Sequence, residues 1–384
     1  MRLAVYTDYA YRRGEEGVFG ERAFVLFLSE LARHVDKLVL VGRLDPGSDS
    51  ADRLRYRLDD DVEFRALPHY GTLARPWGAI RAMHSTSRSF RAVLDEVDTV
   101  WLLGPHPFSL LFAAEAARRR KRIALGIRSN FAEYVRMRHP TRRAIQLAGW
   151  VLALSYRVLA FAVPTIVVGP EVAREYRRAR ALLEISVSLL RDGDLASAGT
   201  ALARSYGGDL RVLSVGRIET EKNPLLIADV MALLIADDRR WRLVLCGEGD
   251  LAEDFRERIH RLGIADHVEM VGYMPLHGGL LDMYRDAHVF LHVSWTEGVP
   301  QVLFEAFGTG LPVVATAVGG VAETVEDDAL LVPPGDAQSA VDALRRIASD
   351  GSLRKRLIVG GLERVRERTL EKEAGRVAAF LHDA

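Results

Sequence analysis

Two carboxylates that could bind a ligand, Glu297 and Glu305, stand eight positions apart in the sequence. Between them lie a turn of Gly298, Val299 and Pro300 and the start of an apolar run with helical spacing. This pattern predicts a helix that begins near Val299 or Pro300, with Glu297 in the loop before it and Glu305 about two turns inside it. The unpaired N–H groups and the positive dipole end of such a helix would suit a phosphate group.

The elements after this helix are also predicted by the sequence. Gly308 and Gly310 are expected to end the helix, and residues 312–316 (PVVAT) have the composition of a short buried strand. A second Gly-rich turn, Gly319 and Gly320, then leads into another helix start. A loop with two carboxylates and Gly-rich turns outside strand ends is typical of a ligand crevice in an open α/β sheet.

Two cations follow an earlier predicted strand, residues 211–215. Arg217 and Lys222 lie in the loop after that strand, with Asn223 as a plausible N-cap and Pro224 at the first helical position. Cations beside a helix start at a strand end indicate a polyphosphate site. The alternative interpretation of these two residues is ordinary surface charge.

The first half of the chain also alternates strands and helices. Residues 2–7 predict the first strand, residues 23–34 a helix, and the polar segment between them, with Gly14, Gly17 and Gly20, a flexible loop. Further strands are predicted at residues 38–42, 61–68, 99–105, 122–128 and 165–170. This alternation predicts an α/β fold with parallel, doubly wound sheets.

His106 directly follows one of these strands and is flanked by Pro105 and Pro107. A histidine at the carboxyl end of a strand lies where ligands bind in doubly wound sheets. His106 is therefore either a catalytic residue or a structural histidine of the helix that follows.

The length of 384 residues favours two domains of ordinary size. Strong periodicity is lost over residues 170–209 and returns afterwards, so the boundary is placed there. The expected division is residues 1–190, residues 191–365, and a C-terminal helix over residues 366–384 that crosses back to the first domain.

Charge is divided unevenly although the formal net charge is zero. Residues 1–190 hold 30 Lys and Arg against 21 Asp and Glu, and the remainder holds 22 against 31. The basic half could contact an anionic acceptor or an acidic membrane surface, or its charges could be solvated helix faces. The lone cysteine, Cys246, lies in an apolar run and is expected to be a core residue of a protein in a reducing compartment.

The N-terminus has a strand pattern and lacks the apolar core of a signal peptide. The apolar region of residues 144–168 is broken by polar residues and Pro164, so a packed helix and a strand are expected there instead of a membrane span. Together these features predict a cytoplasmic protein, with peripheral contact to the inner face of the membrane as one interpretation of the basic half.

The second half contains the motifs SVGRIETEKN, GYM and TEGVPQVLFEAFGTGLPVVAT, the last followed by VGG and E, within roughly residues 211–340. By these motifs it resembles the retaining, nucleotide-sugar-dependent glycosyltransferases of family 4, which have the GT-B fold. The pair Glu297 and Glu305 corresponds to the E-x7-E motif of that family. In the first half the match is limited to the Gly-containing loop and the GPHP segment that contains His106.

The resemblance implies two Rossmann-like domains facing across a cleft, with the sugar nucleotide in the C-terminal domain and the acceptor in the N-terminal one. It implies a hexosyl transfer from a UDP- or GDP-linked sugar to a hydroxyl of a glycan, a lipid-linked or a small-molecule acceptor. Retention of configuration through an oxocarbenium-like, front-face path is expected, without a covalent Glu297 intermediate and without a metal or other cofactor.

The same resemblance assigns roles to individual residues. Arg217 and Lys222 would neutralise the leaving diphosphate, and Glu305 would accept hydrogen bonds from ribose hydroxyls. Further donor contacts are expected from the backbone or side chains of Gly298, Val299, Gln301, Val302 and Met274. The sequence has Pro300 where some relatives have glycine, which removes one N–H donor.

Glu297 and His106 are the expected catalytic residues, both beside the donor sugar. Gly17 and Gly20 would let the backbone approach the phosphates or the acceptor closely. Tyr273 and Met274 are candidates to line the base pocket and leave uracil and guanine as alternatives.

Other classes fit the residues less well. A metal-dependent GT-A transferase needs a D-x-D motif at a strand end, for which Asp59, Asp60 and Asp61 are a candidate, and they have the sequence of a charged surface turn. An epimerase or phosphorylase could share the two-domain fold, and a catalytically silent sugar-nucleotide-binding subunit would be expected to lack Arg217, Lys222 or the paired glutamates. The basic clusters lack the interleaved aromatic residues or a reading motif of a nucleic-acid-binding protein.

Overall fold

A computed structural model describes residues 1–45, 56–68, 76–186 and 188–383; the side chains of residues 76–83 and of Met137 lie outside this description. The chain divides into two compact units, and each is described by itself. Unit 1 comprises Met1–Leu189 together with Leu370–Ala384, and unit 2 comprises Leu190–Thr369. The division falls beside the boundary expected after residue 190, and the C-terminal helix belongs to unit 1.

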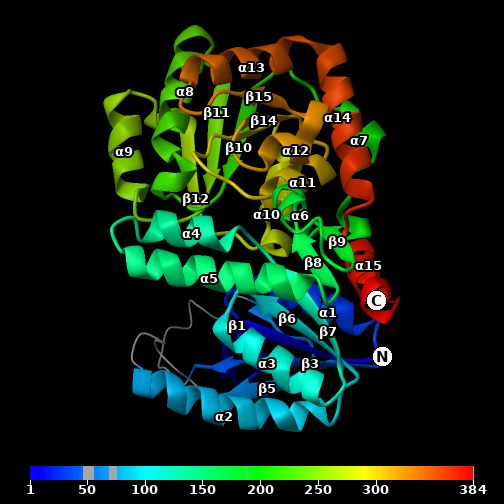
Figure 1. Cartoon of the computed structure of the whole chain (residues 1–384). Coiled ribbons are helices and arrows are strands. Elements are labelled where there is room, and N and C mark those ends of the chain that lie inside the picture. Colours follow the sequence, from blue (N-terminus) through cyan, green and yellow to red (C-terminus); the bar gives the residue numbers. More distant parts are fainter. Residues whose placement is uncertain (46–55, 69–75, 187, 384) are drawn as a thin grey trace. The chain divides into compact units, whose positions relative to one another are not determined.

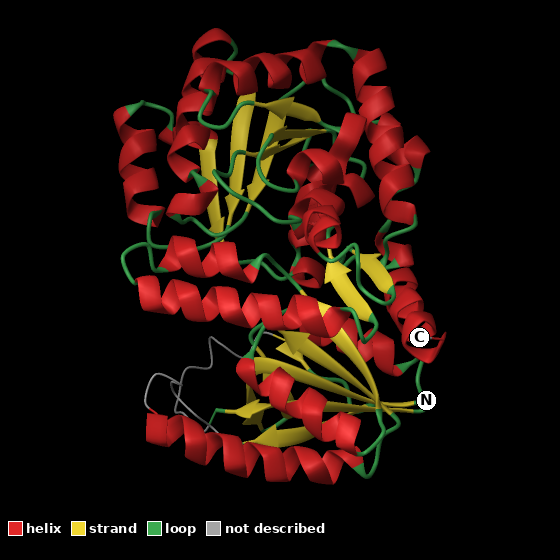
Figure 2. Cartoon of the chain, viewed as in Figure 1, coloured by secondary structure: helices red, strands yellow, loops and turns green. Residues whose placement is uncertain are grey.

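Unit 1 is built on a mixed sheet whose central strands are parallel (Figure 2). Its strands are β1 (Arg2–Gly14), β2 (Gly17–Gly20), β3 (Lys37–Leu44), β4 (Tyr56–Arg57), β5 (Val62–Leu67), β6 (Thr99–Gly104), β7 (Arg122–Ile127), β8 (Thr165–Val168) and β9 (Leu182–Ile185). The parallel strands follow the order β5-β3-β1-β6-β7-β8-β9. The predicted doubly wound sheet is confirmed, because the chain reverses its direction of strand addition between β1 and β6.

Helices cover both faces of this sheet, as alternating side chains on the buried strands require (Figure 1). The helices of unit 1 are α1 (Phe24–Ala32), α2 (Pro76–Leu94), α3 (Pro107–Arg118), α4 (Phe131–Arg138), α5 (Arg143–Ala160), α6 (Pro170–Glu175) and α15 (Leu370–Asp383). Leu3 and Val5 of β1 pack with α1 and α15 on one face. Ala4 and Tyr6 pack on the other face, with α3 and the inner side of α5.

The flexible Gly loop predicted between residues 8 and 22 is wrong. β1 continues to Gly14 and pairs with β2 as an antiparallel hairpin, with Tyr11 opposite Gly20 and Gly14 opposite Gly17. This pairing satisfies backbone groups that a loop would leave to solvent. The glycines serve the hairpin: Gly17 has a φ of 130°, and a Cβ at Gly20 would lie 2.6 Å from Val25 Cγ2.

Unit 2 is built on a six-stranded sheet with the order β12-β11-β10-β13-β14-β15, and every pairing in it is parallel. Its strands are β10 (Leu210–Val215), β11 (Trp241–Cys246), β12 (Val268–Gly272), β13 (Val289–His292), β14 (Val313–Thr316) and β15 (Leu330–Val332). This is the strand order of a dinucleotide-binding fold, with its switch point between β10 and β13. Cys246 at the end of β11 is buried, as predicted.

Helices also flank the sheet of unit 2. They are α7 (Ala198–Leu202), α8 (Pro224–Asp237), α9 (Ala252–Arg261), α10 (Leu280–Asp286), α11 (Gln301–Gly308), α12 (Val321–Val325), α13 (Ala337–Ser349) and α14 (Gly351–Arg366). Short 3-10 turns occur at η2 (Asp192–Asp194), η3 (Thr220–Lys222), η4 (Ala265–His267), η5 (Leu276–Gly278) and η6 (Glu326–Asp328). The side chains of α8 and α13 share one large core with the strands.

The stretch from 170 to 209, where the sequence loses strong periodicity, contains α6, β9 and α7, which are too short for a periodic pattern to reveal. The packed helix predicted near residue 144 exists as α5, but its outer face is exposed, with Leu147 62% and Val158 58% accessible. Among the described residues, none of the helices combines the length and apolar character that a bilayer span requires.

Candidate functional site

The predicted ligand-binding loops of unit 2 come together at the switch point of its sheet. The loop after β10 carries Arg217 and Lys222, and the loop after β13 carries Glu297. The two loops are joined by a hydrogen bond from the Trp295 N–H to the Glu221 carbonyl, 2.8 Å long. Parallel neighbours end at the same sheet edge, so Lys222 and Glu297, which are 75 positions apart in the sequence, become direct neighbours.

Lys222 and Glu297 form a largely buried ion pair at this edge, through Lys222 Nζ and Glu297 Oε1. The same carboxylate oxygen accepts a hydrogen bond from Ser294 Oγ at 2.7 Å and lies 3.0 Å from His292 Nε2. Burial opposes ionisation of Glu297, but the contacts with His292 and Lys222 outweigh it and lower its pKa to about 2. Glu297 therefore carries its negative charge at any physiological pH.

His292 and Ser294 were not recognised from the sequence. His292 ends β13 and Ser294 follows it, so both have the positions of core strand residues, and both are buried. The alternation in the segment FLHVS could have indicated that His292 and Ser294 share one face and precede the Glu297 turn.

Arg217 is held by two carboxylates of its own loop. Its guanidinium pairs with Glu219, and with Glu221 at 2.5 Å, while its side chain stays largely exposed. Asn223 is the N-cap residue of α8, as predicted, but it adopts a left-handed backbone with φ 50° and its side chain makes no cap bond. Pro224 begins α8, as predicted.

The helix after Glu297 is α11, which begins at Gln301 with Pro300 as its N-cap, just after the predicted start near Val299 or Pro300. Val299 precedes its first turn and Val302 lies within it, so their N–H groups and that of Gln301 belong to the positive end of the helix. A Cβ built at Gly298 would meet nothing within 4 Å, which leaves open space beside the turn.

The Gly-rich turn after β14 packs against the backbone of the loop that carries Glu297. A Cβ at Gly319 would lie 1.8 Å from the Glu297 carbonyl oxygen, and Gly319 has a φ of 50°. The Gly320 N–H donates to that carbonyl at 3.3 Å. Only glycine permits this approach, so the turn fixes where the Glu297 side chain begins.

Glu305 lies on α11 and is only 5% exposed. Its carboxylate accepts a hydrogen bond from the Tyr284 hydroxyl, 2.9 Å long. Burial raises the pKa of Glu305 to about 7, and the bond from Tyr284 opposes that shift only in part. Tyr284, on α10, is a further partner that the sequence did not indicate, since it lies in a different helix.

Because burial raises the pKa of Glu305, this residue should make stability fall with rising pH. Its pKa is about 7 in the folded chain against an ordinary 4.5, so between these values the folded state binds more protons than the unfolded state. The contribution is fully present below the unfolded pKa and is lost as the pH rises through 7. Glu305→Gln, which keeps an acceptor for Tyr284, should therefore be more stable than wild type at pH ~8 by roughly 1–3 kcal/mol.

Thermal unfolding of both proteins across this pH range measures the effect. The difference in melting temperature should shrink towards acid pH, and Glu363→Gln on the exposed face of α14 is the matched control. Equal pH dependence in wild type and Glu305→Gln would contradict the raised pKa.

Met274 follows the end of β12, in the turn that leads to η5. It is partly buried, and a Cβ at Gly279 would lie 3.3 Å from its sulfur. The carboxyl end of β12 is at the same sheet edge as the Lys222 loop, two strands away through β11. Met274 thus lies at the edge of the unit 2 sheet where the strands have their carboxyl ends, which is where ligands bind in such sheets. Gly216 and Gly247, which follow β10 and β11, lie at the same edge.

His106 lies at the switch point of the unit 1 sheet, between the ends of β1 and β6. Its Nδ1 accepts the Phe108 N–H at 3.3 Å and is 3.0 Å from the Tyr6 hydroxyl. A backbone N–H can only donate, so Nδ1 is unprotonated and the neutral ring carries its proton on Nε2. Burial lowers the pKa of His106 to about 4, which keeps the ring neutral at pH 7. His106 is thus both the N-cap of α3 and a neutral donor.

Tyr156 of α5 fixes the position of the His106 loop by hydrogen bonds to its backbone. Its hydroxyl accepts the His106 N–H at 3.0 Å and donates to the His106 carbonyl at 3.1 Å. A Cβ at Gly104 would lie 2.1 Å from this hydroxyl, so glycine is required there. The backbone of His106 is therefore positioned by a helix that lies fifty residues later in the chain.

Three charged residues join His106 at this edge, and none was recognised from the sequence. Arg128, after β7, pairs with Asp8 at 2.9 Å, and Arg43 of β3 donates to the Asp8 carbonyl at 2.6 and 3.0 Å. The β1–β3 register shifts between Tyr6 and Ala10, which turns Asp8 out of the regular ladder. These residues come from four strands, so their proximity depends on the sheet order.

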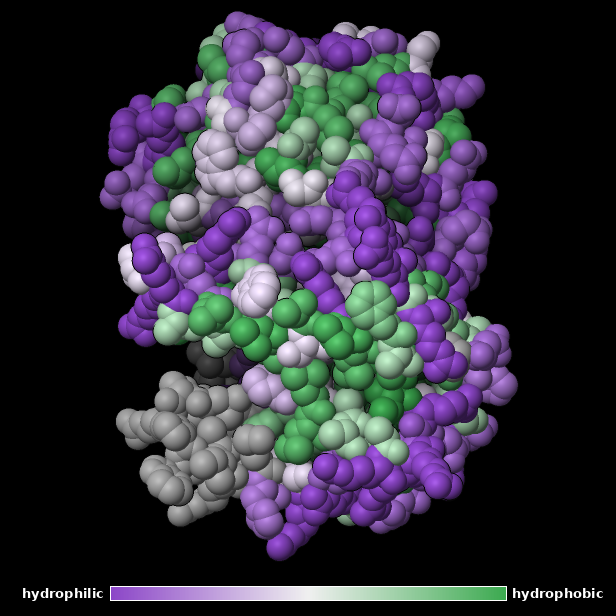
Figure 3. Space-filling view, viewed as in Figure 1, coloured by the Kyte–Doolittle hydropathy of each residue, from purple (hydrophilic) through white to green (hydrophobic). Residues whose placement is uncertain are grey.

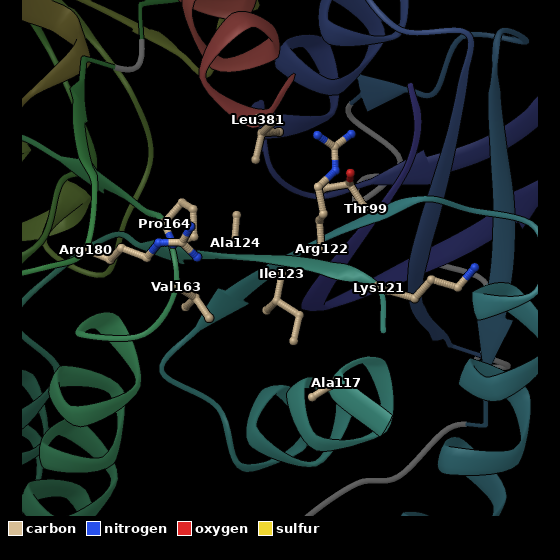
Figure 4. Close-up of a pocket in the computed structure, with 10 residues that line it drawn as sticks. All are labelled: Thr99, Ala117, Lys121, Arg122, Ile123, Ala124, Val163, Pro164, Arg180 and Leu381. Atoms are coloured by element: carbon tan, nitrogen blue, oxygen red, sulfur yellow. The ribbon is translucent and has the colours of Figure 1, made fainter. Parts of the chain in front are cut away.

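The remaining candidates lie elsewhere. Asp59, Asp60 and Asp61 form a turn before the amino end of β5, and Asp60 pairs with Arg57 at 2.7 Å. A cavity of about 290 Å³ in unit 1 also opens at the amino ends of strands, where β6 and β7 begin (Figure 4). Figure 4 shows the Lys121 side chain extending away from Ile123 and Val163. Neither feature is at the ligand edge of its sheet.

The sequence of unit 2 is similar to that of known glycosyltransferases. Residues 203–364, within unit 2, match the family model described as glycosyl transferases group 1. The lipopolysaccharide core biosynthesis mannosyltransferase LpsB of Rhizobium meliloti is 29% identical over 174 residues, which are 43% of this chain and 49% of that protein. The chain spans about half the length of the curated relatives it matches.

The solved structures of several other proteins align with the whole length of this chain. Sucrose-phosphate synthase from Thermosynechococcus elongatus has a TM-score of 0.73 at 20% identity over 100% of this chain and 98% of that one. HepE from Anabaena, solved in complex with UDP, has a TM-score of 0.71 at 15% identity over 100% of both chains. At these identities the likeness concerns the fold. The family match shows that residues 203–364 are similar to the glycosyl transferases group 1 family, and the likeness of the whole chain to these structures shows that it adopts the GT-B fold.

Proposed function

We propose that this protein is a retaining glycosyltransferase. It moves a hexosyl unit from a UDP- or GDP-linked sugar to a hydroxyl of a glycan, a lipid-linked or a small-molecule acceptor. The observation that carries the proposal is the Lys222–Glu297 pair at the switch point of unit 2, beside the start of α11.

The pair has the chemistry that a sugar nucleotide requires. An ammonium group has three donors, so Lys222 can keep Glu297 and bind a phosphate oxygen as well. Because Lys222 Nζ and Glu297 Oε1 are in contact, a diphosphate bound to Lys222 would have its sugar next to Glu297. The permanent charge of Glu297 then favours positive charge on the anomeric carbon.

In the proposed step, the bond between the anomeric carbon and the phosphate oxygen breaks and its electron pair leaves with the nucleoside diphosphate. The acceptor oxygen attacks from the same face, and its proton passes to the leaving phosphate oxygen. Lys222, Arg217 and the N–H groups at the start of α11 stabilise the phosphate charge, so no metal is required in this scheme. Glu305 and Met274 bind the nucleoside, and neutral His106 offers Nε2–H to the donor sugar.

Relatives support the donor class. The curated relative LpsB is described as a mannosyltransferase, and HepE was solved with UDP. We extend to this chain a nucleoside diphosphate sugar as donor and a hydroxyl-bearing carbohydrate or lipid as acceptor. The single buried thiol fits a cytoplasmic location, which we also propose.

A thermal-shift panel of UDP, GDP and ADP and their sugars tests the proposal. A nucleotide present at about 100 times its dissociation constant should raise the melting temperature by roughly 5 °C or more. Transfer to an acceptor should continue in EDTA, and the anomeric configuration of the product, read by NMR, should match that of the donor.

The panel separates the alternatives as well. If no nucleotide raises the melting temperature, the proposed donor site is wrong. Nucleotide binding without transfer to any sugar or lipid acceptor would favour a catalytically silent binding subunit instead, and inversion at the anomeric carbon would contradict the retaining mechanism.

A further inference from the structure

The outer face of α5 carries an apolar surface that the proposed transfer does not use. The described residues include twelve exposed large apolar side chains, and eight of them lie between residues 134 and 161. They are Tyr134, Ile145, Leu147, Trp150, Val151, Leu154, Val158 and Phe161. Figure 3 shows this surface as a green band along the position of α5 in Figure 1. The other four are scattered over unit 2.

The spacing of these residues makes a continuous stripe. Leu147, Trp150, Val151, Leu154 and Val158 recur every three or four positions, so they share one side of the helix. The opposite side, with Gly149, Ala153, Tyr156 and Ala160, is buried in unit 1. Helix α5 is therefore apolar on both sides, and a helix of that kind normally has a partner on each.

Arginines surround the stripe. Residues 131–180 hold nine arginines and three glutamates. Arg136, Arg138, Arg142 and Arg143 are exposed near the start of α5, and Arg157, Arg177 and Arg178 near its end. Two of the three glutamates are paired with arginines, Glu133 with Arg136 and Glu175 with Arg157. The surface is thus apolar in its middle and cationic at both ends.

A groove between α4 and α5 combines both properties. It has a volume of about 500 Å³, and its lining includes Arg136, Arg143, Leu147 and Trp150. The two guanidinium groups could bind a phosphate oxygen, while the indole and the leucine contact acyl chains below the headgroups. A second copy of this chain would bring its own arginines against these, so charge favours an anionic partner.

We propose that the α4–α5 surface, residues 131–161, docks on the face of an anionic lipid bilayer. The apolar stripe enters the boundary between headgroups and acyl chains, and the flanking arginines bind lipid phosphates. Aromatic side chains, Trp150, Phe161 and Tyr134, are the types that prefer this interface.

Docking also has a consequence for the site of unit 1, which rests on the proposed function. The buried side of α5 holds the His106 loop through the Tyr156 hydroxyl. One helix diameter, about 10 Å, therefore separates His106 from the lipid surface. This geometry favours an acceptor hydroxyl carried on a lipid headgroup among the acceptor classes proposed above.

Vesicle co-sedimentation of the full chain tests the docking independently of any transfer activity. The protein should bind vesicles of phosphatidylcholine mixed with phosphatidylglycerol, bind phosphatidylcholine alone at least about 10-fold more weakly, and lose affinity as salt is raised. Trp150 should be quenched by brominated lipids, and this quenching should disappear in Trp150→Phe.

Two sets of exposed substitutions identify the surface. Leu147→Gln, Val151→Gln and Val158→Gln together, or Arg136→Gln, Arg142→Gln and Arg143→Gln together, should each reduce vesicle binding about 10-fold or more. Matched controls are Leu202→Gln with Leu233→Gln, and Arg256→Gln with Arg261→Gln and Arg346→Gln, all exposed in unit 2. Melting temperature and nucleoside diphosphate binding should stay unchanged in every variant.

Three results would overturn the docking proposal. The first is no binding of wild type to anionic vesicles at low salt, and the second is equal binding by the substituted and control proteins. The third is a dimer in sedimentation velocity that the glutamine triple variant abolishes, which would assign the stripe to a second copy. None of these measurements depends on donor binding, so failure here leaves the transferase proposal to its own test.

Discussion

Replacing Lys222 by alanine should weaken nucleoside diphosphate binding by roughly 10- to 100-fold, because charge-assisted hydrogen bonds contribute about 1.5–3 kcal/mol each. Lys222 lies at the turn before α11, where its Nζ is in contact with Glu297 Oε1. Its removal leaves that buried carboxylate without its cation, so two like charges would meet when a diphosphate arrives. Turnover should fall further, by about 10²–10³, since phosphate charge grows as the glycosidic bond breaks.

Isothermal titration with the diphosphate selected by the thermal-shift panel measures the binding, and release of diphosphate measures turnover. Lys355→Ala is the control, because this lysine is exposed on α14 and lies outside the site. A Lys222→Ala protein that unfolds normally and still binds the diphosphate with wild-type affinity would remove the phosphate role of Lys222.

The Glu297→Gln protein should show the opposite pattern in binding. The pKa of about 2 means that the substitution removes a full negative charge at neutral pH. Lys222 then loses its competing carboxylate, so diphosphate affinity should stay the same or rise by a few-fold. Turnover should fall by about 10²–10³, because the charge that favours an oxocarbenium-like transition state is gone.

This contrast separates two roles for Glu297. If Glu297→Gln weakens diphosphate binding as much as Lys222→Ala does, Glu297 acts by holding the lysine and not at the sugar. Glu363→Gln on the exposed face of α14 serves as the charge-matched control. Unchanged turnover in Glu297→Gln would contradict a role beside the reacting carbon.

Much of the unit 2 site could be predicted from local sequence. The turn from Glu297 to Pro300, a helix that starts close to Pro300 and the strand β14 all follow from glycine, proline and apolar spacing within about twenty residues. The loop with Arg217 and Lys222 is likewise signalled by a strand, a polar turn and Pro224. Each of these signals depends on the backbone preferences of residues that are close in the chain, and those preferences follow directly from the residue types.

The partners of these residues could not be predicted in the same way. His292 and Ser294 face Glu297 because β13 ends there, and Tyr284 reaches Glu305 from another helix. Asp8, Arg43 and Arg128 gather beside His106 only because four strands end at one sheet edge. The pKa values that decide the charge of Glu297, Glu305 and His106 depend on burial and on the neighbouring polar and charged side chains that the fold places beside each residue.

By itself the amino-acid sequence determined the alternation of strands and helices, the two Gly-rich turns and the residue types of the ligand edge. Tertiary structure alone decided that residues 8–20 form a hairpin and not a loop, since Tyr11 and Gly20 must find each other across the β1–β2 turn. It also decided which apolar side of α5 is covered and which is exposed. Periodicity reports that a side chain is apolar, but whether water, protein or lipid meets it depends on packing between elements distant in the chain.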